Sequence, residues 1–213
     1  DACARRVDMP LKPSLPRTCA ALALLTSTWA FAADVRVQLA GADGRPLPQA
    51  VVSLESPAAR AAVQPGRDIS IAQVGMRFEP RVTVVPVGTP VAFPNHDTVR
   101  HHVYSFSAAK TFELKLYSGT PAQPVVFDRA GVAVLGCNIH DDMVAWVVVV
   151  DTPYHARTDA HGQALLAGVP PGAYRLRVWH QGLPEGARPH EQPLDVPAGG
   201  ASVTLRLTPA NRP

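Results

Sequence analysis

Short apolar runs separated by glycine and proline turns make up most of the chain. We find no sustained 3.6-residue period after the N-terminal segment, so we expect little helix. Runs rich in valine, leucine and alanine predict strands at residues 69–74, 81–85, 89–93, 102–106, 111–117, 124–127, 133–137 and 144–150. Many short strands at this spacing are typical of a β-sandwich rather than of a parallel α/β sheet.

Alternating strands also lie on both sides of this segment. Residues 34–40 and 50–54 flank an Asp43-Gly44 turn, which predicts a hairpin. Further strands are expected at 165–169, 174–179 and 201–207, and residues 58–70 have the composition of a linker. Three or four strands form only a thin core. We therefore expect the late strands to pack with residues 34–57.

The N-terminal segment has the pattern of a secretory signal. Lys12 and Arg17 precede an apolar run at 19–25, and Ala30-Phe31-Ala32 matches a cleavage site. The run is too short to span a bilayer. We expect a leader over residues 1–32, a true start at Met9, and a periplasmic mature protein. A hydrophobic N-terminal strand is the alternative.

Removing this leader changes the charge and the cysteine count. Four of the 20 Lys+Arg and two of the 17 Asp+Glu lie in residues 1–32, so 16 basic and 15 acidic residues follow. A net charge of +1 gives no argument for a nucleic-acid partner. Cys3 and Cys19 also lie in the leader. A lone thiol, Cys137, in an oxidising compartment favours burial or metal binding.

Cys137, His140 and Met143 form a Cys-x-x-His-x-x-Met loop between two apolar strands. Thiolate, imidazole and thioether suit copper, and a His₂Cys site with a weak axial Met is typical of electron-transfer copper. A second histidine must come from elsewhere. His101, 36 residues before Cys137, is the candidate, and its neighbour His102 in a shifted register is the alternative.

Other chemistry lacks its motifs. The sequence has no Gly-x-Ser-x-Gly, phosphate loop or His-Glu-x-x-His, so we do not expect an enzyme. Zinc is an alternative metal because Cys and His bind both, but Met is a poor zinc ligand. A second metal patch at His96 and His102 is a weaker hypothesis than solvated histidines.

Residues 70–150 resemble the cupredoxins, especially the amicyanin and plastocyanin branch and the plastocyanin-like proteins often labelled methylamine utilisation proteins. The residues that carry the resemblance are Met76-Arg77-Phe78-Glu79-Pro80, residues 87–93 leading into Asn95, His101, and Cys137-x-x-His140-x-x-Met143. The resemblance implies a Greek-key sandwich with one copper ion on His101, Cys137, His140 and Met143. Cupredoxins usually carry Asn directly after the first histidine, and this chain has His102 there.

Residues 34–57 with 154–208 resemble the carboxypeptidase regulatory-like (transthyretin-like) sandwich. Residues 44–47 and 50–52 match its first hairpin, and 158–162 with 170–174 match its later strands. We therefore expect an all-β chain in which a cupredoxin domain, 69–150, is inserted into a discontinuous sandwich of 34–57 and 151–208.

The resulting hypothesis is an exported type 1 copper protein that carries single electrons between redox partners. The mature protein would have no membrane span and no nucleic-acid partner. A periplasmic copper-binding or copper-delivery module without electron transfer is the alternative, and a metal-free scaffold is a third. The intact ligand set argues against the scaffold. Asp141 and Asp142 beside the site could lower the reduction potential or select a basic partner.

Overall fold

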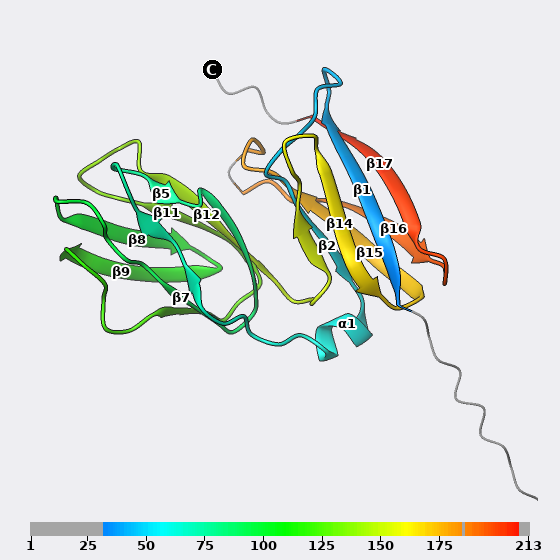
Figure 1. Ribbon diagram of the computed structural model, residues 1–213, viewed down its shortest axis with the longest axis horizontal. Helices are drawn as coiled ribbons and strands as arrows, with labels where there is room; N and C mark the ends of the chain where they lie inside the picture. The colour runs from blue at the N-terminus through cyan, green and yellow to red at the C-terminus, as the bar shows by residue number, and fades with distance from the viewer. Residues whose placement is uncertain (1–31, 185, 209–213) are drawn as a thin grey trace, which may run out of the picture.

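The computed structural model describes residues 32–184 and 186–208, whose regular structure is nearly all β-strand (Figure 1). This confirms the all-β prediction. The predicted signal segment lies outside the described residues, apart from Ala32. Within the described ranges, no helix has the length and apolar character that a membrane crossing needs.

One unit is built from the two ends of the described chain. Its first sheet has the order β14-β1-β17 and its second the order β13-β2-β15-β16. The bounds are β1 (Ala33–Gly41), β2 (Val51–Glu55), β13 (His155–Arg157), β14 (Gln163–Val169), β15 (Gly172–Trp179), β16 (His190–Val196) and β17 (Ala201–Leu207). Alternate residues of β1 are buried, so Val35, Val37 and Leu39 point into the core that these sheets share.

The strands between β2 and β13 build a second unit. Its sheets have the orders β6-β12-β11-β8-β9, β10-β7-β3 and β4-β5. The bounds are β3 (Ile69–Ser70), β4 (Ala72–Gln73), β5 (Phe78–Glu79), β6 (Val82–Pro86), β7 (Thr89–Ala92), β8 (His101–Ser107), β9 (Lys110–Tyr117), β10 (Val125–Phe127), β11 (Gly131–Gly136) and β12 (Val144–Val150). Because β2 and β13 pair with each other, this unit interrupts the first one in sequence.

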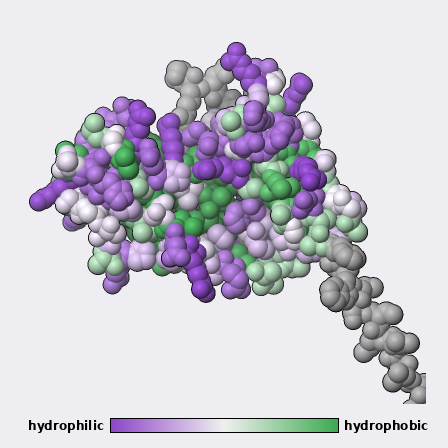
Figure 2. All heavy atoms as spheres, viewed as in Figure 1, coloured by the Kyte–Doolittle hydropathy of each residue, from purple (hydrophilic) through white to green (hydrophobic). Residues whose placement is uncertain are grey.

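An apolar interface joins the two units. The odd-numbered residues of β12 face the core of the second unit, whereas Trp146, Val148 and Val150 cluster with Val51 and Trp179 of the first. The two indole rings lie 6.4 Å apart between centroids. Apolar surface gathers where the two lobes meet (Figure 2). Since both faces of β12 are covered, its sequence is a continuous apolar run rather than an alternation.

Several elements differ from the sequence expectations. The expected linker begins with a short helix, α1 (Pro57–Ala61), which Ser56 caps and Arg60 anchors to Asp151 at 2.7 Å. The strand expected at 69–74 is split into β3 and β4, which belong to different sheets. Strands β13 and β16 were not expected, since β13 is very short and β16 is polar and contains Pro193. The domain boundaries at 57 and 151 stay predictions.

Candidate metal centre

The loop 137–143 is held between two strands of one hairpin. β11 and β12 pair antiparallel up to Gly136 and Val144. Cys137 directly follows β11 and Met143 directly precedes β12, so the two residues lie at the same end of the hairpin. Both are buried, with exposures of 4% and 1%. The Met143 N–H donates to the His140 carbonyl at 3.0 Å, which closes the loop into a tight turn. His140 is only partly buried and lies at the edge of the core.

His101 begins β8, the neighbour of β11 in the five-stranded sheet. Because side chains alternate along a strand, His101 and Val103 face inward and Phe106 faces outward. His101 is completely buried. The pairing of Tyr104 with Gly136 sets the start of β8 beside the loop that carries Cys137. The order of strands thus places His101, which is distant in sequence, next to the hairpin loop.

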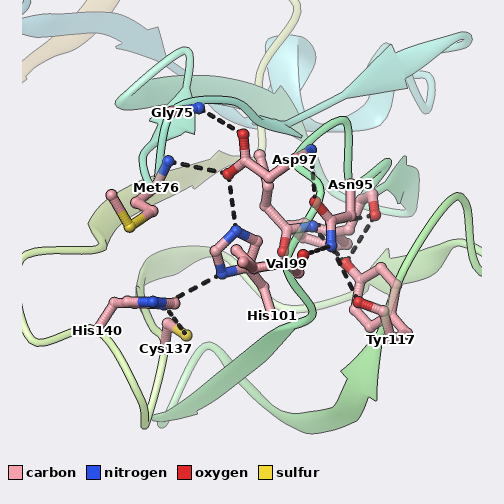
Figure 3. Close-up of polar contacts among 11 residues, drawn as sticks. Gly75, Met76, Asn95, Asp97, Val99, His101, Tyr117, Cys137 and His140 are labelled. Carbon is pink, nitrogen blue, oxygen red and sulfur yellow. Dashed lines mark hydrogen bonds and ion pairs between the residues drawn. The ribbon is translucent and has the colours of Figure 1, made fainter.

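The donor atoms of His101, Cys137 and His140 all lie within 4.8 Å of one another (Figure 3). The Nδ1 atoms of the two histidines are 3.2 Å apart, and His140 Nδ1 lies 3.7 Å from Cys137 Sγ. Nitrogen and sulfur ligands bind a first-row metal such as zinc at about 2.0 and 2.3 Å, so two donors on one ion lie about 3.2–3.8 Å apart. The two distances from His140 and the donor set fit a single metal ion.

Three other residues of the sequence hypotheses, Met143, His102 and His96, lie in different surroundings. Met143 is buried in the same hydrophobic cluster as Cys137, and its role as a metal ligand stays a prediction. The His102 ring is directed to the other side of β8, where its Nε2 lies 3.0 Å from Glu113 Oε1 without hydrogen-bond geometry. His96 is exposed. The structure therefore brings His101, and neither His96 nor His102, to Cys137 and His140.

Sequence reasoning missed Asp97, which contacts the candidate ligand His101. Asp97 Oδ2 lies 2.7 Å from His101 Nε2, and the backbone N–H groups of Gly75 and Met76 donate to the same carboxylate at 2.6 and 2.9 Å. The Met76 N–H is the largest influence on the Asp97 pKa and lowers it, with His101 and Gly75 acting in the same direction against burial. The carboxylate is thus held in its charged form.

A second polar network fixes the loop between β7 and β8. The Tyr117 hydroxyl accepts from Gln73 Nε2 and donates to the Phe93 carbonyl at 2.7 Å. Burial raises the pKa of Tyr117 to about 12, so it stays a donor. Asn95 Nδ2 donates to the Val99 and Tyr117 carbonyls, each at 2.9 Å. An Asn-His-Asp run indicates a turn, and this was the only signal for these contacts in the sequence.

Several large apolar residues of the loops near the candidate ligands are exposed. Val74, Met76, Val99 and Ile139 are 40%, 52%, 46% and 49% exposed. Met76 and Val99 lie beside the ligand cluster in Figure 3, and Ile139 directly precedes His140. Asp141 and Asp142 follow it and are exposed. The partly buried His140 therefore has an exposed apolar residue before it in the chain and two exposed acidic residues after it.

Comparison with known proteins gives partial likenesses. No protein-family model matches this chain, and no curated protein does either. A reduced, Cu(I) form of an amicyanin variant is 24% identical over 46% of this chain and 98% of its own, with a TM-score of 0.36. A purple cupredoxin from Nitrosopumilus maritimus is 26% identical over 39% of this chain and 100% of its own, with a TM-score of 0.35. Both likenesses cover less than half of this chain.

Proposed function

We propose that this chain is an exported type 1 copper protein of the cupredoxin kind that carries single electrons between redox partners. The convergence of His101, Cys137 and His140 donor atoms within 4.8 Å carries the proposal. One thiolate and two imidazoles are the ligand set that suits copper in electron-transfer sites, and Met143 would add a weak thioether ligand. Bound copper would supply a one-electron couple between Cu(I) and Cu(II).

The contribution of the chain is a donor set that stays in place. Cys137 and Met143 are anchored by β11 and β12, and His101 by β8 in the same sheet. Cys137 is only 4% exposed, so burial keeps water away from its sulfur. Ligands on packed strands keep one geometry better than ligands on free loops. A fixed geometry suits electron transfer, because little reorganisation accompanies the change in charge.

The exposed residues near His140 support a redox partner of matching chemistry. Electron exchange needs a close approach, and His140 is the ligand that lies at the surface. Exposed Met76, Val99 and Ile139 offer apolar contact there. Asp141 and Asp142 add negative charge, which favours a partner with basic residues around an apolar patch. Export by the leader belongs to the same proposal, whereas docking of a partner or the cell envelope through a transthyretin-like part belongs to the copper-delivery alternative.

Voltammetry of the copper-loaded mature protein tests this function. We expect a reversible one-electron wave that persists over repeated cycles, because the donor set serves both oxidation states. Cys137→Ala should abolish the wave, whereas His96→Asn, which changes an exposed histidine of the neighbouring loop, should keep it. A wave that survives Cys137→Ala, or no reversible wave in the wild-type protein, would contradict the proposal.

Copper delivery is a second candidate, and the position of Met76 favours it. Met76 is 52% exposed, and its backbone N–H binds Asp97, the carboxylate that contacts the candidate ligand His101 (Figure 3). Thioethers are soft ligands that suit Cu(I). In this function Met76→Leu would slow Cu(I) transfer to a chelating acceptor without changing the buried site. Equal transfer rates for the variant and the wild-type protein would remove the support for delivery.

A further inference from the structure

The Asp97 carboxylate contacts three donors from two separate segments. It accepts from the backbone N–H groups of Gly75 and Met76, and its Oδ2 lies 2.7 Å from Nε2 of His101. The Asp97 side chain is only 14% exposed, and the His101 side chain is completely buried. Both carboxylate oxygens are therefore in use, and the group is fixed on two sides.

The contact determines where the proton of His101 lies. An ionised carboxylate only accepts hydrogen bonds, so Nε2 of His101 must be the donor. A neutral imidazole carries one N–H, which leaves Nδ1 with its lone pair free. That Nδ1 faces His140 Nδ1 at 3.2 Å, inside the cluster that includes Cys137. The free nitrogen thus points at the candidate metal position.

The turn that carries Gly75 and Met76 is built to hold the carboxylate. β4 and β5 form a hairpin whose two central residues have φ of 58° and 56°, both in the left-handed region. This conformation directs two successive N–H groups at one anion. Met76 is not a glycine, so its φ is unfavourable, and the two charge-assisted bonds to Asp97 offset that cost. The turn therefore positions Asp97, and Asp97 in turn positions His101.

We propose that Asp97 is a positioning residue that holds His101 with its proton on Nε2 and its Nδ1 free to bind the metal. Carboxylates in this relation to a metal-binding histidine set its tautomer and orientation, and losing one costs about 10–100-fold in metal affinity. The inference rests on the proposed function for the identity of the metal. The tautomer itself is a property of the metal-free chain and is tested without copper.

The first test is ¹⁵N NMR of the histidine rings in the metal-free mature protein at about pH 8, where free histidines are neutral. We expect His101 to be in the Nε2–H form, with a proton that exchanges slowly. Assignment uses His101→Gln, which removes one ring system. A wild-type His101 with its proton on Nδ1, or an even mixture of tautomers, would overturn the proposal, and this arm needs no Asp97 variant to fold.

The second test compares variants in a Cu(I) competition with a colorimetric chelator. Asp97→Asn should weaken Cu(I) binding by about 10–100-fold and lower the Nε2–H population. Asp142→Asn removes the same charge from the exposed part of the ligand loop and should change affinity less than about threefold. Met76→Gly relieves the positive φ, keeps both N–H donors and should leave the His101 tautomer unchanged.

The outcomes separate this proposal from the proposed function. Equal losses of affinity in Asp97→Asn and Asp142→Asn, with an unchanged tautomer, would reduce Asp97 to a general electrostatic effect and overturn the inference. A protein with the expected tautomer and an Asp97-dependent affinity, but without a type 1 spectrum, would retain the inference and contradict the electron-transfer function.

Discussion

The Nδ1 atoms of His101 and His140 lie 3.2 Å apart although 39 residues separate them in the chain. The contact exists because β8 and β11 are neighbours in one sheet, and Tyr104 pairs with Gly136 across them. Two imidazole nitrogens at this distance repel unless a proton or a cation lies between their lone pairs. The order of strands in the sheet therefore creates the donor cluster. A metal ion between the two nitrogens would remove their repulsion.

The adjacent histidines of β8 give a matched pair of variants. His101→Gln should abolish the intense thiolate-to-copper absorption and weaken copper binding by more than the 10–100-fold typical of outer-shell changes. His102→Gln should keep the absorption, since that ring lies near Glu113. Copper titrations followed by absorption measure both. The opposite ranking would restore the shifted register, in which His102 is the ligand.

Metal binding should stabilise the folded chain. A metal that binds only the folded form adds about 2.7 kcal/mol when its free concentration is 100 times the dissociation constant. Buffered Cu(I) should therefore raise the urea midpoint of the wild-type protein, and removal with a chelator should reverse the rise. Cys137→Ala should show a much smaller rise. Equal stabilisation of both proteins would place the bound copper on surface histidines instead.

The ligand loop was predictable because its chemistry is local. Cys137, His140 and Met143 stand at fixed spacing on one turn, and two apolar strands bracket them. Asp97 was not predictable, because its contact with His101 depends on a loop conformation and on a turn, 75–76, from another hairpin. No periodicity or composition marks such a contact before the loop is folded.

The strands show a similar division. Strong alternation or long apolar runs predicted β1, β8, β12 and β17, whereas β13 and β16 lack either pattern. The helix α1 was missed although Ser56 followed by Pro57 and alanines is a helix-start signal. A single turn needs tertiary contacts to be stable, and the buried Ala59 and the ion pair of Arg60 with Asp151 supply them. Asp151 is far away in sequence.

The interface between the two units should contribute to stability. Trp179 is 8% exposed and packs against Trp146, so Trp179→Ala should cost about 3–5 kcal/mol in the free energy of unfolding. Phe106 is 75% exposed, and Phe106→Ala should stay within about 0.5 kcal/mol. Urea unfolding followed by circular dichroism measures both. Similar costs for the two variants would mean that the interface adds nothing.

Stability should also depend on pH through His155. Burial lowers the pKa of His155, although its Nδ1–H bond to the Thr152 carbonyl acts in the opposite direction. The unfolded chain therefore binds the proton more readily than the folded one. At a pH above about 6.5, the ordinary pKa of histidine, His155 does not reduce the stability of the folded chain. As the pH drops from about 6.5 through the lowered pKa of the folded state, stability falls.

The variant His155→Gln should remove this part of the pH dependence. Urea midpoints at about pH 7.5 and pH 5.5 should lie closer together in His155→Gln than in the wild-type protein. His161→Gln, which changes an exposed turn histidine, is the matched control and should keep the wild-type difference. An unchanged difference in His155→Gln would show that burial of this ring does not govern stability in the acid range.

The most direct measurement is the visible absorption and EPR spectrum of the mature protein loaded with Cu(II), beside Cys137→Ala. His101, Cys137 and His140 converging on one ion predict an intense blue thiolate-to-copper band with narrow copper hyperfine splitting, both lost in the variant. A pale spectrum that Cys137→Ala leaves unchanged would contradict the account, because copper would then bind without the buried thiolate.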